Sequence, residues 1–337
     1  MSEIRGWASH GAKQELKPYT FDAGPLGPEE VEIAVEHCGL CHSDLSVINN
    51  DWGNSQFPFI PGHEAVGRVV ALGEQAKGLK VGQKVGVGWT AASCMACHEC
   101  LSGDHQLCAT SLATIIGHQG GFANKLRAHW AWAIPLPETI DVASTGPLLC
   151  GGITVFSPLM SYDIPPTAHV GVVGIGGLGH MAVKFANAWG CEVTAFSSSE
   201  GKTDEARSFG AHHVISSRNK DAIAGAARTL DLLLVTVNVS LDWPALLETL
   251  KPHGRMHVLG AVLEPLAVPA FSLIGAQRSV SGSPTGSPTG IATMLQFAAR
   301  HGIAPQVEHF PMSKVNDALE HLKAGKARYR IVLDADF

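Results

Sequence analysis

The densest cluster of reactive side chains is the stretch CMACHECLSGDHQLC, whose cysteines follow a C-x2-C-x2-C-x7-C spacing. Four thiolates at this spacing suit a tetrahedral zinc ion, and a zinc with four cysteine ligands is structural because no position remains for a substrate. An iron–sulfur cluster also takes four thiolates, but the long last spacer differs from the compact run of bacterial ferredoxins. The predicted zinc ligands are Cys94, Cys97, Cys100 and Cys108.

Three further stretches carry possible metal ligands far apart in the sequence. CGLCHSD contains Cys41, PGHEAVG contains His63, and GPLLCGGIT contains Cys150. Two thiolates and one imidazole can form an open zinc site, with the fourth position free for water or a carbonyl oxygen. Each residue alone has a simpler explanation, since buried cysteines are usually core residues and the chain has 17 histidines. Together with a nucleotide-binding fold, they indicate a catalytic metal.

A glycine-rich stretch, VGVVGIGGLGHMAV, joins an apolar strand to a helix. In that context the G-x-G-x-x-G pattern indicates dinucleotide binding. The first glycine permits a tight turn, the second lets the backbone approach a pyrophosphate, and the third allows close packing of helix on strand. The helix N-terminus then offers amide donors to the phosphates. The predicted cofactor contacts are Gly174, Gly176, Gly177, Leu178 and Gly179, with Thr236 and Gly260 further along the chain.

The stretch VTAFSSSEGK, residues 193–202, occupies the second strand of this nucleotide-binding unit and the turn after it. An acid at the end of that strand would bind the ribose 2′-hydroxyl of NAD and repel a 2′-phosphate. Ser197 and Ser198 can instead donate hydrogen bonds to phosphate oxygens, and Lys202 adds a positive charge. We therefore expect NADP(H) as the cofactor. The alternative is that the serines only form a turn and a helix cap.

The elements around these residues change character near residue 150. Before it, stretches such as EVEIAVEHC alternate apolar and polar residues, as half-buried strands do. After it, short apolar strands alternate with helical segments, which predicts a parallel sheet with right-handed crossovers. The predicted strands are 170–173, 192–196, 213–215, 231–235 and 255–259, and the predicted helices are roughly 177–189, 202–209, 219–228 and 242–250. We expect domains of residues 1–149, on which residues 284–337 pack back, and of residues 150–283.

Length, charge and hydropathy restrict the class of protein. The 337 residues are enough for two domains, and the net charge of −6 argues against a nucleic-acid partner. The most apolar run, HVGVVGIGGLGHMAV, is too short to span a bilayer and is interrupted by glycines, so no membrane partner is expected. The first ten residues lack the apolar core of a signal peptide. We expect a cytoplasmic protein whose clustered cysteines bind metal rather than form disulfides.

Seven motifs stand in order over essentially the whole chain and resemble those of the zinc-dependent medium-chain alcohol dehydrogenases. They are CGLCHSDL, PGHEAVGRV, the CMACHEC lobe, GPLLCGGITVFSPL, GVVGIGGLGHMAVKFA, AFSSS and KARYRIVL. Within that family the chain resembles the cinnamyl-alcohol-dehydrogenase branch and its bacterial NADPH-dependent, broad-range aldehyde reductases. The resemblance implies a GroES-like, mostly-β catalytic domain and a Rossmann cofactor-binding domain, with the active site in the cleft between them.

The resemblance implies two zinc ions per chain. Cys41, His63 and Cys150 match the ligands of the catalytic zinc, and the four clustered cysteines match the structural zinc site. Glu64 matches an acid beside the catalytic zinc, and Asp44 matches an acid that orients the histidine ligand.

Other positions match the family's proton relay and cofactor pocket. Ser43 matches the relay hydroxyl, and His42 matches a position near the cofactor's phosphates that ends the relay. Arg330 matches a basic residue near the cofactor. Gly201 interrupts a lysine pair that is frequent in this branch, which puts strict NADP preference in doubt. Two cysteines match no ligand position and are expected in the core, namely Cys38 and Cys191.

The implied activity is reversible reduction of aliphatic and aromatic aldehydes to primary alcohols. Zinc would polarise the aldehyde, NADPH would deliver a hydride, and Ser43 would pass on the proton. Trp52 and Trp89 are expected either to line an apolar substrate pocket or to belong to the core. The alternatives are an NAD-preferring alcohol or polyol dehydrogenase, a redox sensor without turnover, and a quinone-reductase-like protein without zinc. The expected partners are small-molecule substrates and further copies of the chain, as a homodimer or homotetramer.

Overall fold

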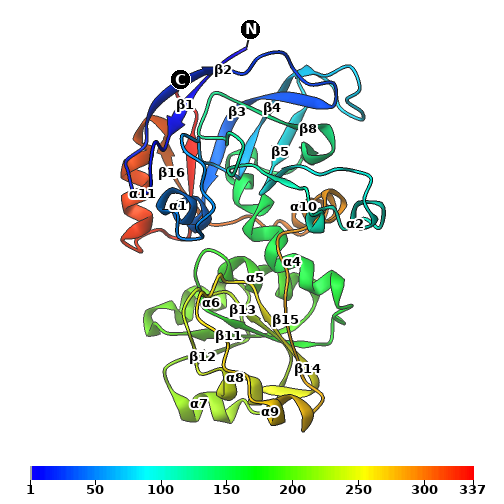
Figure 1. The fold of residues 1–337 in the computed structure, drawn as a ribbon. Coiled ribbons are helices and arrows are strands. Elements are labelled where there is room, and N and C mark those ends of the chain that lie inside the picture. The colour runs from blue at the N-terminus through cyan, green and yellow to red at the C-terminus, as the bar shows by residue number, and fades with distance from the viewer. Residues whose placement is uncertain (1) are drawn as a thin grey trace. The chain divides into compact units, whose positions relative to one another are not determined.

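The computed structural model describes residues 2–337, and its contacts divide the chain into two compact units. The first unit comprises Met1–Ile153 and Thr285–Phe337, and the second comprises Thr154–Pro284. The helix α4 (Gly151–Ser161) contains the point where the chain passes from one unit to the other. Figure 1 shows the elements of both units.

The first unit is built on a seven-stranded sheet of order β16-β17-β3-β4-β5-β9, with β8 also paired to β3. All of its pairs are antiparallel except β16 with β17, so strands from the end of the chain join those from its beginning. β3 alternates apolar and polar residues and contributes Val31 and Ile33 to a fully buried core. The strands of this sheet are β3 (Glu30–Leu40), β4 (Ala65–Leu72), β5 (Lys84–Val87), β8 (Lys125–His129), β9 (Ile134–Pro135), β16 (Val307–Pro311) and β17 (Arg330–Asp334).

Two strand pairs and several helices complete the first unit. Two separate strand pairs, β1 with β2 and β6 with β7, are both antiparallel. The long helix α10 begins at an N-cap serine, Ser287, followed by a proline, and ends at Gly302 in the left-handed region, as helix-terminus chemistry favours. These elements are β1 (Glu3–Ala8), β2 (Lys17–Asp22), α1 (His42–Asn49), β6 (Thr90–Ala92), α2 (His98–Leu101), β7 (Leu112–Ala113), α3 (Val142–Thr145), α10 (Pro288–His301) and α11 (Val315–Lys323).

The second unit is a six-stranded, fully parallel sheet of order β12-β11-β10-β13-β14-β15. The first strand of the unit lies in the middle and the chain winds outward in both directions, which is the Rossmann topology. Its strands are β10 (His169–Val173), β11 (Glu192–Ser197), β12 (His213–Ser216), β13 (Leu230–Val235), β14 (Leu250–Val258) and β15 (Ser279–Gly282). Its helices are α5 (Gly179–Trp189), α6 (Thr203–Ser208), α7 (Lys220–Gly225), α8 (Trp243–Glu248) and α9 (Ala270–Ile274).

The fold prediction of a mostly-β domain with a doubly wound parallel sheet is confirmed. The five strands listed above for the second unit are present within a few residues, and the sheet has a sixth strand, β15, which was not among them. Over residues 2–337 no single helix is long and apolar enough to cross a membrane; one bent pair, Val142–Leu149 with Gly151–Ser161, passes the same test only as a pair.

Candidate active site and cofactor loop

Two groups of four metal-ligand side chains exist among the described residues, and in each group the donor atoms all lie within 4.8 Å of one another. One group contains the four clustered cysteines, and the other contains four residues of the predicted open site. The members are Cys94, Cys97, Cys100 and Cys108 in the first group, and Cys41, His63, Glu64 and Cys150 in the second. Both groups belong to the first unit.

Cys41 owes its position to the end of β3 and the start of α1. It is the N-cap of α1, with extended backbone angles, and its amide donates to the carboxylate of Asp44 at 2.9 Å. Asp44 is therefore both the capping acid of the helix and a fully buried charge. The same carboxylate accepts from the amide of Gly62 and from Nδ1 of His63, each at 2.9 Å. The bond from Nδ1 to Asp44 turns the other ring nitrogen, Nε2, toward Cys150, whose sulfur lies 3.3 Å away. This is the arrangement that the expected orienting role of Asp44 requires.

Glu64 and Arg330 form a fully buried ion pair beside the cysteine ligands. Nη2 of Arg330 donates to Oε1 of Glu64, and Nη1 lies 3.8 Å from the sulfur of Cys41. Gly39 is required opposite the pair, since a Cβ there would overlap the Glu64 carboxylate. The pairing places Arg330 at the metal group, a contact that the sequence analysis did not identify. The only sequence signal is a charged residue at the start of the apolar strand RIVLD.

Burial and neighbouring charges set the protonation of this group. Burial raises the pKa of Glu64 to about 7, although the charge of Arg330 lowers it. The pKa of the Cys41 thiol is held well below its ordinary value by its hydrogen bond with Cys150, against the effect of burial, and by the charge of Arg330. A thiolate at Cys41 is the form that binds a metal.

The donors present fit a zinc ion. Two sulfurs and an imidazole nitrogen are the ligand types of open zinc sites, and Oε2 of Glu64 is buried without a hydrogen-bond partner. A buried carboxylate oxygen without a partner is unfavourable unless a cation completes it. Cys41, His63 and Cys150 would therefore hold the ion, with Glu64 beside it.

The four-cysteine lobe follows β6 and is closed by β7. Backbone amides point at its sulfurs, because Cys97 N lies 3.3 Å from Cys94 Sγ and Cys94 N lies 3.5 Å from Cys108 Sγ. The amide of Cys94 lowers the pKa of Cys108 to about 6. Four sulfurs supported by amide donors fit a closed zinc site.

The predicted proton-relay residues lie in the first turn of α1. His42 is exposed and Ser43 is half-buried, directly after the ligand position Cys41. Both lie at the N-terminus of α1, and their relay roles stay predictions.

Two tryptophans lie beside the imidazole of His63. Trp89 packs against that ring edge-on, with ring centroids 5.1 Å apart, and Trp52 packs on Trp89 at 5.9 Å. Both indoles are partly buried. The two indoles and the imidazole of the predicted ligand His63 thus form a continuous aromatic cluster.

The glycine loop of the second unit has the close contacts that its sequence predicts. Gly174 has φ of +90°, and a Cβ on Gly179 would overlap the carbonyl oxygen of Gly174. Thr236 ties the end of β13 to the loop, because its hydroxyl donates to the carbonyls of Val173 and Gly174. Nothing lies within 4 Å of the position of a Cβ on Gly176, so the backbone is open to a ligand there. β10 lies between β11 and β13, at the switch point where doubly wound sheets bind ligands.

Two of the residues expected to bind the 2′-phosphate, Ser197 and Lys202, make hydrogen bonds to nearby backbone atoms. The hydroxyl of Ser197 is buried and makes a local turn, donating to Ser199 O and accepting from Ser199 N. These are the bonds that the turn alternative requires, Ser198 is exposed, and the phosphate contacts of both serines stay predictions. Nζ of Lys202 donates to the carbonyl of Ile175 in the glycine loop at 2.7 Å, which brings its charge to the loop.

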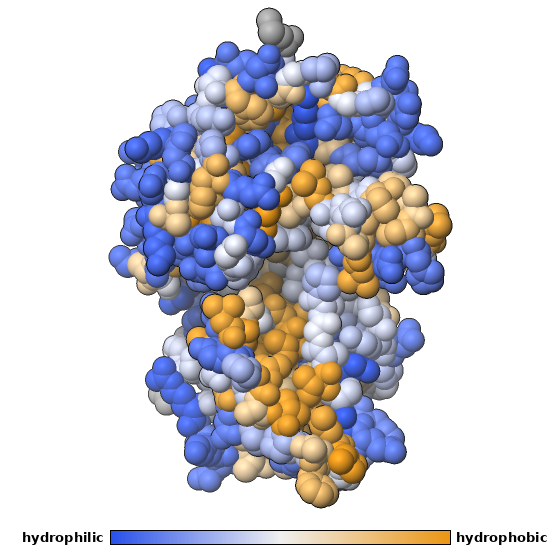
Figure 2. All heavy atoms as spheres, viewed as in Figure 1, coloured by the Kyte–Doolittle hydropathy of each residue, from blue (hydrophilic) through white to orange (hydrophobic). Residues whose placement is uncertain are grey.

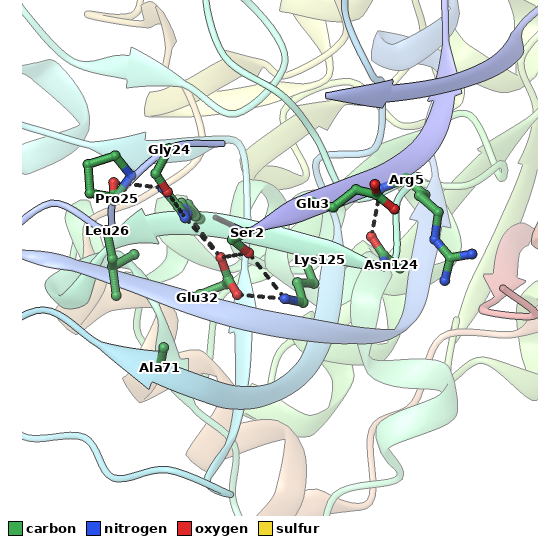
Figure 3. Close-up of a pocket in the computed structure, with 11 residues that line it drawn as sticks. Ser2, Glu3, Arg5, Gly24, Pro25, Leu26, Glu32, Ala71, Asn124 and Lys125 are labelled. Atoms are coloured by element: carbon green, nitrogen blue, oxygen red, sulfur yellow. Dashed lines mark hydrogen bonds and ion pairs between the residues drawn. The ribbon is translucent and has the colours of Figure 1, made fainter. Parts of the chain in front are cut away.

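A polar cavity of about 580 Å³ lies elsewhere in the first unit (Figure 3). Glu32 is its buried acid, and its carboxylate accepts from Ser2, Lys125 and Arg127 at 2.7 to 3.1 Å. Arg127 also donates to three carbonyls of residues 23–25. These bonds neutralise the carboxylate of Glu32 and hold residues 23–25, which follow β2, against Arg127 of β8. We therefore assign the cavity a structural role.

Comparison with known proteins agrees with the geometry. Residues 27–138 match the family model of the alcohol dehydrogenase GroES-like domain, and residues 177–300 match that of zinc-binding dehydrogenases. An aldehyde reductase of Synechocystis sp. is 54% identical, with 98% of each chain covered. Among solved structures, a cinnamyl alcohol dehydrogenase of Sorghum bicolor has a TM-score of 0.95 at 40% identity, covering 99% of this chain and 98% of that one. A Helicobacter pylori enzyme of the same type, complexed with NADP(H), has a TM-score of 0.90 at 30% identity, with 98% of each chain covered. The chain therefore belongs to the zinc-binding alcohol dehydrogenases, in the cinnamyl-alcohol-dehydrogenase branch, and is an oxidoreductase of aldehydes and alcohols.

Proposed function

We propose that this enzyme reduces a broad range of aliphatic and aromatic aldehydes with NADPH. The observation that carries the cofactor preference is the end of β11, where an exposed serine replaces the acid expected for NAD and a lysine reaches the glycine loop. A carboxylate would repel a 2′-phosphate, whereas Ser198 and Lys202 can bind one. The NADP(H) complex of the Helicobacter pylori relative supports the same choice.

The proposed site residues act around the substrate oxygen. Zinc when bound would act as a Lewis acid, and NADPH would supply the hydride. Asp44 holds His63 in the tautomer with Nε2 unprotonated, which orients the ring for a metal. Ser43 would donate the proton that the product oxygen requires, and His42, exposed next to it, would exchange that proton with solvent.

The aromatic surface supports the substrate class. Trp89 contacts the ligand His63 and Trp52 extends the surface, so an apolar chain or ring attached to the aldehyde would lie on indole faces. We propose that these tryptophans line the substrate pocket.

Two further proposals concern organisation. The unit of Met1–Ile153 and Thr285–Phe337 would be the catalytic domain, and the unit of Thr154–Pro284 the cofactor-binding domain of a cytoplasmic enzyme.

We also propose a homodimer or homotetramer joined at β15, an edge strand of its sheet. Apolar residues gather on the unit of Thr154–Pro284 in Figure 2. Three of its apolar residues, Leu263, Phe271 and Ile274, expose 71%, 85% and 69% of their surface, as residues of an interface between chains would in a single chain.

The test compares kcat/KM for benzaldehyde or hexanal with NADPH and with NADH. We expect a preference for NADPH of about a hundredfold, or about 2.7 kcal/mol. Lys202→Ala should lower the NADPH value and leave the NADH value unchanged, whereas Lys220→Ala, an exposed lysine at the start of α7, should change neither. Equal rates with both cofactors would favour a reversible alcohol dehydrogenase, and the serines would then be a turn only.

A further inference from the structure

The imidazole of His180, in the first turn of α5, is bonded to the glycine loop from inside the second unit. His180 has no exposed surface, and its Nδ1 lies 3.0 Å from the carbonyl oxygen of Gly176. Because a carbonyl oxygen can only accept, Nδ1 must carry the proton and donate it. The backbone amide of His180 donates to the same oxygen at 3.1 Å. The ring also packs edge-on against Phe209, with centroids 5.6 Å apart, which fixes its orientation.

The carbonyls of four successive loop residues, 173–176, each accept a hydrogen bond from a side chain. Thr236 serves the first two, Lys202 the third and His180 the fourth. Each carbonyl oxygen is the negative end of a peptide dipole, so these bonds keep four groups that would repel a phosphate engaged with the protein itself.

The peptide between Gly176 and Gly177 shows what the bond from His180 does. This peptide is trans, so its N–H points opposite to its C=O. With the carbonyl held by the ring of His180, the amide of Gly177 must point the other way. In the part of the chain that the structure describes, the amides of Gly177 and Leu178 have no hydrogen-bond acceptor, and both residues are half-exposed. They are open donors for an anion at the start of α5.

We propose that His180 is a positioning residue for the cofactor, because its ring fixes the peptide whose amide, that of Gly177, donates to the pyrophosphate. The backbone bond to Gly176 is the terminal bond of the helix, where helices fray, and α5 has no side-chain N-cap. The ring supplies the second donor that holds this peptide in place. The inference rests on the dinucleotide cofactor of the proposed function but not on the choice of NADPH, since NADH carries the same pyrophosphate.

The test compares two substitutions in the full-length enzyme. His180→Asn keeps an N–H donor two bonds from Cβ, as Nδ1 is, whereas His180→Leu fills the site but offers no donor. His180→Leu should raise the Kd of NADPH and of NADH by the same factor, at least about fivefold, or about 1 kcal/mol. His180→Asn should stay within about twofold of the wild type. Nicotinamide fluorescence measures both Kd values, and kcat at saturating cofactor should not fall in either variant.

Thermal stability separates positioning from packing. The smaller asparagine leaves unfilled volume beside Phe209, so His180→Asn should lower the melting temperature at least as much as His180→Leu does. A purely structural role would therefore make the asparagine variant the weaker binder of cofactor, whereas the positioning role makes it the stronger one.

His257 is the matched control, because it also has no exposed surface but its ring nitrogens lie 2.8 and 2.9 Å from the hydroxyls of Ser281 and Ser283, outside the loop. His257→Leu should lower the melting temperature and leave both Kd values unchanged. The inference is overturned if His180→Leu binds the cofactors as the wild type does, or if His180→Asn and His180→Leu weaken binding equally. Failure of the NADPH preference is distinguishable, since it appears as equal Kd values of the wild type for NADPH and NADH.

Discussion

Replacing Asp44 by asparagine tests how the buried acid organises the candidate catalytic centre. The carboxylate accepts three hydrogen bonds of 2.9 Å, from the amides of Cys41 and Gly62 and from the ring of His63. An asparagine oxygen can keep the two bonds on the Oδ1 side, but its NH2 group would then face the amide of Cys41. That amide would lose its acceptor in a fully buried place, which costs about 1–3 kcal/mol.

The same change should weaken zinc binding at the catalytic centre. His63 loses a charged acceptor, and changes to such orienting groups typically cost about 10–100-fold in metal affinity, or about 1.4–2.7 kcal/mol. We therefore expect Asp44→Asn to release one of two zinc ions at a chelator concentration at least about tenfold lower than the wild type does. Aldehyde reduction should fall in parallel.

The assay measures retained zinc against chelator concentration, with kcat/KM and the melting temperature on the same samples. Asp51→Asn is the matched control, since Asp51 is exposed just beyond the same helix. The reasoning is refuted if Asp44→Asn keeps both zinc ions at wild-type chelator concentrations and keeps its kcat/KM. Loss of the structural zinc alone would also contradict it.

Three further predictions concern stability and cofactor binding. Burial would raise the pKa of Glu32, but hydrogen bonds from Lys125, Ser2 and Arg127 lower it overall. Its stabilising effect should therefore be complete above its ordinary pKa of 4.5 and disappear as the pH falls through the lowered value, so the free energies of unfolding of Glu32→Gln and of the wild type should converge at acidic pH. Burial lowers the pKa of His257 to about 4, so the unfolded chain binds more protons between about pH 4 and 6.5 and stability should rise with pH across that window; denaturant titrations of His257→Gln should show a flatter rise. Gly179→Ala should force the glycine loop to move and weaken NADPH binding at least about tenfold, measured by cofactor fluorescence, while the zinc content stays unchanged.

The second unit could be predicted almost completely from the sequence. Its central strands are continuous apolar runs between glycine turns, as strands covered on both faces must be. The strand β15, with the sequence SVSG, was not among the five predicted strands. It lies at the edge of the sheet, where one neighbour and partial exposure remove the need for an apolar run.

The ligand residues of the metal centre could be predicted from the sequence, but the contacts between them and their neighbours could not. Cys41 and Cys150 are far apart in sequence, and only the family motifs bring them together, because spacing carries no information over such a distance. The hydroxyl of Ser197, a predicted phosphate contact, makes hydrogen bonds to the backbone of Ser199 in its own turn. Serine side chains commonly make such local bonds, which the sequence pattern alone does not distinguish from contacts to a ligand.

The C-terminal strand β17 explains why the chain returns to the first unit after the parallel sheet. Its first residue, Arg330, neutralises Glu64, a carboxylate with no exposed surface. Without that cation, Glu64 would be a buried charge beside two cysteines, a state that costs several kcal/mol and favours protonation. Its last residue, Asp334, lies between two histidines of the neighbouring strands. The strand therefore supplies a cation to the candidate catalytic centre and, at its other end, a carboxylate that accepts from two imidazoles of the neighbouring strands, and its pairing with β3 fixes its register.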